Sequence, residues 1–319
     1  MNDAPLVPGQ EAGFACVGCF TTEKRQARGD GIHAYAADPE GDAWSHAQHL
    51  PGLVNPSFLV VGPGGRALYA VHGDQDYASA FARDAQTGWL RPIGQAAAGS
   101  GNVVHGALDP AGQHFVVANY ASGSVAVLPV AGNGGRGGYA QRVTMPGMPG
   151  PHRTEQAASH PHHVAFDPGG RFVLVPDKDH DSVCVFGFDA GRGVLEPASV
   201  VMSRPGAGPR HGAFHPALPA YWVLNELDSS VTTCRWSVRA GILEPMQVLP
   251  TLPPDLFGAS AAAAIAVTPD GRHVFASNRG HDGIAGFAVD AVTGQLEPLG
   301  WTRALGRGPR FTTFHGNCL

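Results

Sequence analysis

The sequence contains little charge and no cluster of basic residues. Only 15% of its 319 residues are Asp, Glu, Lys or Arg, and the formal net charge is -5. Proteins that hold nucleic acids do so with grouped Lys and Arg side chains that neutralise phosphates. The composition therefore argues against a nucleic-acid partner.

Long apolar runs are also absent. The longest, Ala261 to Val267, is far shorter than the roughly 20 residues that a helix needs to cross a bilayer. The N-terminus, Met1-Asn2-Asp3-Ala4-Pro5, lacks the basic flank and apolar core of a secretory signal. We therefore expect a cytoplasmic protein without a membrane partner, in which residues 1–13 form a flexible extension.

The five cysteines do not indicate a disulfide framework, because their number is odd. Cys16 and Cys19 have the spacing of a metal or redox pair. In the strand expected there, residues three apart point to opposite faces, and no second pair follows. We interpret them as small, partly buried thiols, and the sequence indicates no cofactor.

What the sequence has in abundance is turn residues, with 44 Gly and 27 Pro, arranged in β-type repeats. The stretch His160 to Lys178 is typical of two apolar strands joined by a Pro-Gly-Gly turn. Further copies begin at Asn55, Asn102, Gly208, Ala261 and Gly308, and each is expected to open a strand. Consecutive copies start 47 to 58 residues apart, which suits one four-stranded sheet per repeat. We predict an all-β propeller of four-stranded blades that forms a single domain over residues 1–319.

The opening segment lacks one strand of a blade. Strands are expected within Phe14 to Phe20, Gly31 to Tyr35 and Ala43 to Leu50, directly before the first full copy. These are the second to fourth strands of a blade. Propellers commonly close by sharing one blade between the two chain ends, so the first strand has to come from elsewhere in the chain.

The hairpin geometry of the repeats locates a candidate site. The start of the first strand and the end of the second lie at the same rim of a blade, because the two strands are antiparallel. Sixteen residues separate these two positions in each copy: Ser57 and Gly73, Val104 and Tyr120, His162 and Lys178, Arg210 and Glu226, Ala263 and Arg279. If the first strands line the central channel, these residues gather around one of its mouths.

Polar residues that differ from blade to blade at this rim favour a functional role. The set is His162, Lys178, Arg210, Glu226 and Arg279. Structural alternatives exist for its members. Lys178 could be solvated on a loop, and Arg210 with Glu226 could be an ion pair that joins two strands of one blade. One position further along, His163 and His211 could pack as hydrogen-bonded core histidines.

A column rich in Asn and Asp precedes the second rim position. Its members are Asn119, Asp177, Asn225 and Asn278. Such a column could hold calcium through oxygen ligands, but it contains only one carboxylate. We favour hydrogen bonding to turns, which is the usual role of these residues where a strand enters a loop.

Several of these motifs resemble the lactonase family of seven-bladed propellers. The motifs are Gly208-Pro209-Arg210-His211, Asn225-Glu226-Leu227-Asp228-Ser229-Ser230-Val231, Thr268-Pro269-Asp270-Gly271-Arg272-His273 and Ser277-Asn278-Arg279. The resemblance runs from about Phe14 to Phe314. The family includes bacterial 6-phosphogluconolactonases and fungal carboxymuconate-lactonizing enzymes. The resemblance implies chemistry without a metal at the channel mouth, and the site of the cyclase branch falls on His162, Arg210, Glu226 and Arg279.

The sequence departs from the family pattern at two places. Ala264 stands where phosphogluconolactonases of the family usually have an acidic residue, so one polar contact is lost. The family also has one more full blade after the Gly308 copy, which makes the last blade incomplete here. Either the residues Arg310 to Phe314 close a six-bladed ring onto the N-terminal strands, or the ring is open and truncated relative to the family. We favour the open ring.

These observations lead to the hypothesis of a lactone hydrolase similar to 6-phosphogluconolactonase. Glu226 or His162 would activate water, and Arg210 would stabilise the negative charge that develops on the carbonyl oxygen. The expected contacts to a small anionic lactone or carboxylate are Arg279, Lys178, His163, His211 and Asn225. A carboxymuconate-type cycloisomerase and a non-catalytic binding propeller remain open alternatives, as do the natural lactone and the oligomeric state.

Overall fold

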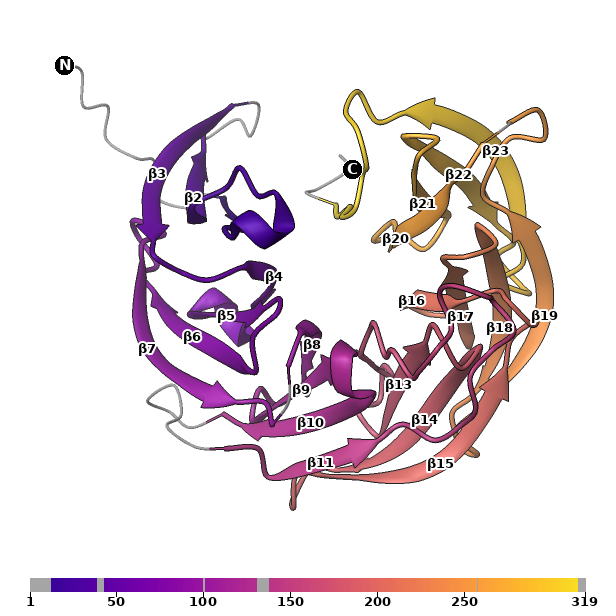
Figure 1. Cartoon of the computed structure of the whole chain (residues 1–319), viewed down its shortest axis with the longest axis horizontal. Coiled ribbons are helices and arrows are strands. Elements are labelled where there is room, and N and C mark those ends of the chain that lie inside the picture. Colours follow the sequence, from indigo (N-terminus) through magenta and orange to yellow (C-terminus); the bar gives the residue numbers. More distant parts are fainter. Residues whose placement is uncertain (1–12, 39–42, 100, 131–137, 257, 315–319) are drawn as a thin grey trace.

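The computed structural model describes residues 13–38, 43–99, 101–130, 138–256 and 258–314. Its strands form six antiparallel sheets that lie side by side in a ring (Figure 1). The prediction of an all-β propeller with an incomplete last blade is confirmed. The extension expected over residues 1–13 lies outside the described residues, apart from Gly13.

Five of the sheets in the described part of the chain have four strands each, in chain order. The first two consist of β4 (Pro56–Val61), β5 (Ala67–His72), β6 (Tyr77–Arg83) and β7 (Leu90–Ala97), and of β8 (Val103–Leu108), β9 (His114–Asn119), β10 (Ser124–Pro129) and β11 (Gln141–Thr144). The next two consist of β12 (Ala165–Phe166), β13 (Phe172–Asp177), β14 (Ser182–Asp189) and β15 (Val194–Met202), and of β16 (Pro209–Phe214), β17 (Ala220–Asn225), β18 (Ser230–Ser237) and β19 (Ile242–Pro250). The last consists of β20 (Ala261–Val267), β21 (His273–Arg279), β22 (Gly283–Val289) and β23 (Leu296–Arg303).

The N-terminal sheet contains β1 (Phe14–Gly18), β2 (Gly31–Ala37) and β3 (Trp44–Pro51). Gln48 of β3 exchanges two hydrogen bonds, 2.7 and 3.0 Å long, with the backbone of Leu90 in the outermost strand of the next blade. Gln141 makes the same pair of bonds with Leu195 between two outermost strands. By this correspondence β3 is a fourth strand, and the prediction that the first strand is missing from this blade is confirmed for the described residues.

The strand expected at Gly308 to Phe311 does not form. Residues 304–314 contain no strand, and this expectation was wrong for the described residues. A first strand is held by hydrogen bonds to a second one, and no second strand follows it in the part of the chain described. Instead the C-terminal segment lies between the β1–β3 and β20–β23 sheets (Figure 1). Its Phe311 also contacts Phe58 of β4, with ring centroids 6.0 Å apart.

The turn in the repeat that suggested the fold is held by its own side chains. Asp167 accepts hydrogen bonds from the backbone N–H groups of Arg171 and Phe172 at 2.7 and 2.8 Å, and Gly170 takes a positive φ of 66°. The predicted hairpin is therefore confirmed. Its first strand is shorter than expected: only Ala165–Phe166 form β12, and Pro161 pairs with Asp177 in an isolated bridge.

The core lies between the blades, where alternate residues of each strand face the neighbouring sheet. Trp222 of β17, for example, is fully buried against Val274 and Phe287 of the following blade. Cys16 and Cys19 are free, partly buried thiols, as expected, and the Cys19 thiol donates a hydrogen bond to the Gly31 oxygen at 3.0 Å.

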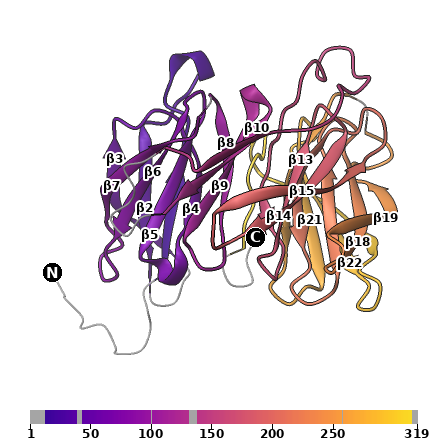
Figure 2. The same cartoon turned by 90° about the horizontal axis from the view of Figure 1, so that it is seen from below.

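Three short 3-10 helices complete the described elements: η1 (Glu23–Arg25), η2 (Pro63–Gly65) and η3 (Tyr120–Ser122). In the edge-on view, η1 and η3 project from the same face of the ring (Figure 2). Among the described residues, no helix has the length and apolar character required to cross a membrane.

Candidate functional site

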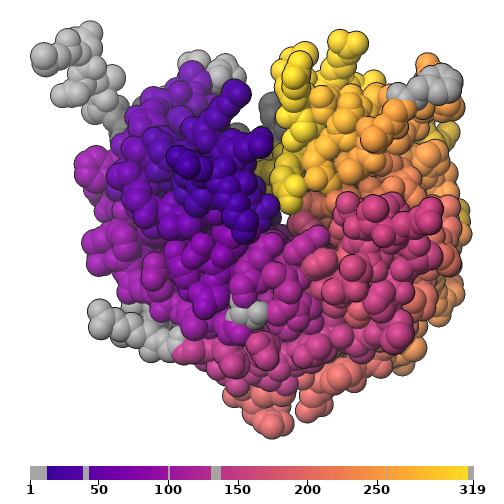
Figure 3. Space-filling model, in the orientation of Figure 1, coloured from indigo at the N-terminus to yellow at the C-terminus, as the bar shows by residue number. Residues whose placement is uncertain are grey.

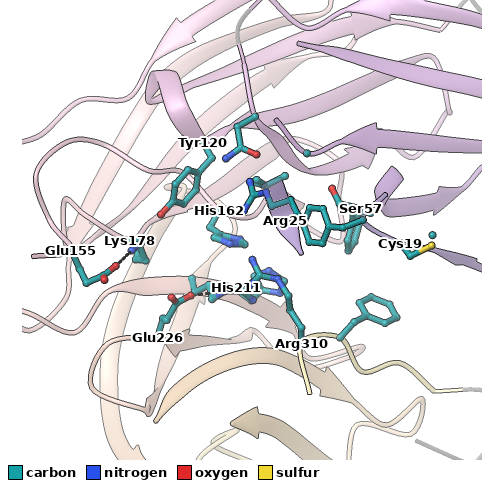
Figure 4. A pocket seen from close by; sticks show the side chains of 18 residues that line it. Cys19, Arg25, Ser57, Tyr120, Glu155, His162, Lys178, His211, Glu226 and Arg310 are labelled. Carbon is teal, nitrogen blue, oxygen red and sulfur yellow. Dashed lines mark hydrogen bonds and ion pairs between the residues drawn. The ribbon is translucent and has the colours of Figure 1, made fainter. Parts of the chain in front are cut away.

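The face that carries η1 and η3 contains a pocket of about 490 Å³, here called the mouth pocket. The space-filling view is hollowed between the N-terminal part of the chain and the C-terminal segment (Figure 3). Side chains from the inner strands, η1, η3 and the C-terminal segment face this hollow (Figure 4). Its polar lining consists of Arg25, Ser57, Asn102, Tyr120, Glu155, His162, Lys178, Arg210, His211, Glu226 and Arg310.

The predicted rim positions meet in this pocket. Four of the five pairs line it completely: Ser57 and Gly73, Val104 and Tyr120, His162 and Lys178, Arg210 and Glu226. The fifth pair, Ala263 and Arg279, is absent from the lining, but Arg279 contacts Glu226 from behind. The hairpin geometry thus brings residues from four blades to one opening, as expected from two antiparallel inner strands.

Arg210, Glu226 and Arg279 form an ion-pair cluster across two blades. The Oε2 atom of Glu226 lies 2.6 Å from Arg210 Nε and 3.1 Å from Arg279 Nη2. Arg210 is 1% exposed, and its Nη1 also donates to the backbone oxygen of Ala263. Both contacts use Oε2, which leaves Glu226 Oε1 without a hydrogen bond to a described residue. The pair is therefore more than a link between two strands of one blade.

The charges in this cluster influence each other. Burial alone would raise the pKa of Glu226, but Arg210, Arg279 and Lys178 hold it below its usual value. Burial lowers the pKa of Arg210 to about 9, against the opposing effect of Glu226. At neutral pH the cluster therefore contains an ionised carboxylate between two charged guanidinium groups.

Lys178 is not solvated on a loop, since only 2% of it is exposed. Its Nζ lies 3.0 Å from Glu155 (Figure 4), and it also lies 3.2 Å from Asp179. Burial would lower the pKa of Lys178, but the neighbouring Tyr120 and the carboxylates raise it above its ordinary value. The side chain is thus a fixed ammonium group in the pocket wall.

Four histidines from three blades meet beneath the pocket, and we call them the channel histidines: His105, His162, His163 and His211. The ring centroids of His105 and His163 are 4.0 Å apart, and those of His163 and His211 are 4.7 Å apart. Only His162 and His211 line the pocket. His163, which we expected to contact substrate, packs among the rings below it.

His162 is a neutral imidazole at the base of the pocket. It is 6% exposed, and its Nδ1 atom has no hydrogen-bond partner among the described residues. Burial, and then the charges of Arg210 and Arg310, lower its pKa well below 6.5. His162 is therefore an unprotonated imidazole in the pocket lining, which can accept a proton.

The structure places Asn225 outside the pocket, so it is not retained as a substrate contact. Its side chain is fully buried and donates to Ser230 and Thr232 at 2.9 and 3.0 Å. Other members of its column hold turns: Asp177 accepts a bond from the His160 N–H, and Asn278 donates to the Thr251 oxygen. Hydrogen bonding to backbone groups is therefore confirmed for Asp177 and Asn278, whereas Asn225 bonds to side chains.

The sequence analysis missed three charged pocket residues: Arg25, Glu155 and Arg310. Arg310 carried a signal, because it occupies the same repeat position as Arg210. Arg25 follows no repeat position, and Glu155 belongs to the long connection before β12. Arg25 is paired with Asp74 at 2.6 Å, whereas Arg310 makes no side-chain hydrogen bond or ion pair with a described residue.

Within the described residues, the pocket holds no three His, Cys, Asp or Glu side chains whose ligand atoms lie within 4.8 Å of one another. The arrangement consists of cations, the carboxylates of Glu155 and Glu226, and the neutral imidazoles of His162 and His211. It can bind an anion, polarise a carbonyl group and accept a proton from water.

Comparisons with known proteins agree with this architecture. The chain matches the family described as "Lactonase, 7-bladed beta-propeller" over residues 14–319. It is 31% identical over 287 residues to the 6-phosphogluconolactonase of Bacillus subtilis, with 89% of this chain and 81% of that protein covered. The 6-phosphogluconolactonase of Cronobacter sakazakii is 32% identical over 261 residues, with 81% and 73% covered. The solved structure of a periplasmic gluconolactonase from Pseudomonas aeruginosa superimposes with a TM-score of 0.86 at 27% identity, with 94% and 85% covered.

Proposed function

Because the chain belongs to the lactonase family of seven-bladed β-propellers, we propose that it hydrolyses a phosphorylated sugar lactone of the 6-phosphogluconolactone type in the mouth pocket. The observation that carries this proposal is the cluster of Glu226 with two guanidinium groups beside the neutral His162. This pocket combines an anion site, a carbonyl-polarising cation and a proton acceptor.

Arg310 is the residue best suited to hold the substrate's phosphate. Its guanidinium extends from the C-terminal segment toward the centre of the pocket (Figure 4). Arg25, Arg210 and Lys178 already contact carboxylates, so their charges are largely compensated. A guanidinium without such a partner forms two parallel hydrogen bonds with a phosphate readily.

The hydrolysis follows from the remaining groups. Water donates one hydrogen bond to Glu226 Oε1, and the imidazole of His162 takes its other proton as the water oxygen adds to the lactone carbonyl carbon. Arg210 stabilises the oxyanion of the tetrahedral intermediate. The intermediate collapses with cleavage of the ring C–O bond, and the proton held by His162 passes to the leaving alkoxide oxygen. The product is the open hydroxy acid.

A substrate panel tests this proposal directly. The purified protein is assayed with 6-phosphogluconolactone, the unphosphorylated lactone and a carboxymuconate, and the spontaneous rate is subtracted. We expect the highest kcat/KM for the phosphorylated lactone, and the same rate after treatment with chelator. Rates equal to the spontaneous rate for every lactone would contradict the proposal, and turnover of the muconate alone would indicate a cycloisomerase.

The role of Arg310 predicts a loss that depends on the substrate. The Arg310→Gln variant should lose about 10- to 200-fold in kcat/KM for the phosphorylated lactone, mainly through KM, since one charge-assisted contact contributes about 1.5–3 kcal/mol. The unphosphorylated lactone should be affected little. The matched control is Arg307→Gln in the same segment, because Arg307 is exposed and lies outside the pocket lining. Equal losses for both substrates would exclude a phosphate contact.

The lowered pKa values of His162 and Glu226 predict the pH dependence. A base with a lowered pKa stays deprotonated to more acidic pH, so kcat/KM should be level from neutral pH to below 6.5 and fall only in more acidic solution. Bound phosphate favours protonated His162, so the acid limb of kcat should lie at higher pH than that of kcat/KM. An acid limb of kcat/KM centred at or above 6.5 would contradict this assignment.

A further inference from the structure

The outer hairpin of the N-terminal blade carries a polar cluster that the proposed reaction does not use. Ile32 of β2 and Leu50 of β3 point into the core, against the neighbouring blade. Since residues alternate along a strand, His33 and His49 occupy the opposite face, and they are directly paired across the two strands. Asp30 precedes β2 at the same end of the hairpin.

Three potential metal ligands converge there. Asp30 Oδ1 lies 2.7 Å from His33 Nε2, and Asp30 Oδ2 lies 3.3 Å from His49 Nε2. The two imidazole rings are stacked with centroids 4.4 Å apart and an angle of 6° between their planes. One ligand atom from each of the three residues lies within 4.8 Å of the others. In the described part of the chain this is the one group of such residues that meets this condition.

The donor set is typical of a borderline divalent transition metal. Imidazole nitrogen and carboxylate oxygen bind Zn²⁺ at about 2.0–2.2 Å, which places tetrahedral ligands about 3.3 Å from one another. The two carboxylate-to-imidazole separations, 2.7 and 3.3 Å, are close to this value, and rotation of the exposed Asp30 side chain can adjust them. The Asp30 side chain is 64% exposed and that of His49 is 33% exposed, so solvent can complete the coordination.

A fourth residue occupies the position of an orienting partner. His46 Nε2 lies 3.0 Å from His33 Nδ1, the ring nitrogen that faces away from Asp30. Histidines that bind a metal usually engage their second nitrogen in a hydrogen bond that holds the ring orientation. The His46 ring is itself packed against Tyr35, with centroids 5.3 Å apart. The cluster thus has both ligands and support for one of them.

We propose that Asp30, His33 and His49 bind a divalent transition metal ion of the Zn²⁺ type, with His46 orienting His33. The bound ion would link β2 to β3 across the sheet and stabilise a blade that has three strands instead of four. The site lies outside the mouth pocket, and the inference does not depend on the proposed lactonase activity.

Zn²⁺ titration by calorimetry tests the site, with the full chain free of any polyhistidine tag and stripped of metal with chelator. We expect one site per chain and a higher thermal unfolding temperature with Zn²⁺, because a ligand that binds only the folded state stabilises it. Asp30→Asn, His33→Ala and His49→Ala should each weaken binding at least about tenfold and abolish the thermal shift, and His46→Ala should weaken it about tenfold. Co²⁺ should give the visible absorption of a low-coordinate site.

His273→Ala is the matched control, since His273 is a strand histidine of the last four-stranded blade whose side chain makes no ion pair with a described residue. It should bind Zn²⁺ like the wild type. Wild-type protein without a Zn²⁺ site, or variants of Asp30, His33 and His49 with unchanged affinity, would overturn the proposal. Asp30→Asn keeps the test valid if a histidine variant fails to fold, because Asp30 lies on the surface.

Discussion

The Glu226→Gln variant should lose about 10²- to 10⁴-fold in kcat/KM for lactone hydrolysis. The amide is uncharged, so the ion pairs of Oε2 with Arg210 and Arg279 are lost. The amide is also a poorer hydrogen-bond acceptor for water than the carboxylate. The loss should appear mostly in kcat, because the phosphate contact to Arg310 is untouched. Steady-state kinetics with the phosphorylated lactone measures it.

Glu244→Gln is the matched control for this change. Glu244 also pairs with an arginine, Arg235, but both side chains are at least half exposed on the outer strands of one blade. Its charge is screened by solvent, so activity and stability should stay close to wild type. Circular dichroism should show Glu226→Gln to be folded, although less stable, because buried Arg210 loses part of its compensation. Full activity of a folded Glu226→Gln protein would refute the role given to the carboxylate.

His162→Gln should lower kcat by about 10²- to 10⁴-fold while KM changes little. Glutamine has a similar size and can fill the space, but its amide cannot take a proton from water at neutral pH. The neutral imidazole of His162 in the pocket lining is the feature that the variant removes. If His162 is the base, the acid limb of the residual kcat/KM should also change its position.

The neighbouring His163 provides the control, because it belongs to the same group of rings but does not line the pocket. His163→Gln disturbs the ring packing to a similar degree and leaves the proposed proton acceptor in place. Its kcat should therefore remain near the wild-type value. Equal losses in His162→Gln and His163→Gln would mean that the histidines contribute through packing, and Glu226 would then be the remaining candidate for the base.

Much of the fold was predictable because its signals are local. A four-stranded blade repeats a short pattern of alternating apolar residues and glycine turns, and the Asp167 turn shows that these residues satisfy their own backbone groups. The rim position of Arg210 and Glu226 followed from the constant length of the first hairpin. The strand expected at Gly308 failed because a strand also needs a partner, which the pattern of a single segment does not report.

The candidate site was predictable only in part. The repeat register predicted that Lys178 lies at the rim. It did not predict that Lys178 is buried between two carboxylates. Asn225 was expected to contact substrate but points away from the pocket, because adjacent residues at a strand end face opposite sides. Glu155 arrives on an irregular connection whose path depends on what it packs against, so no periodic signal marked it.

The sequence by itself determined the ring of small sheets and the rim at which its variable polar residues meet, since hydrogen-bond register and side-chain alternation are set by residues close together in the chain. Only the tertiary structure decided which charges are compensated. It pairs Glu226 with arginines of two blades and leaves Arg310 without an ion pair to any described residue, because such pairings depend on distances of a few ångströms between segments far apart in sequence.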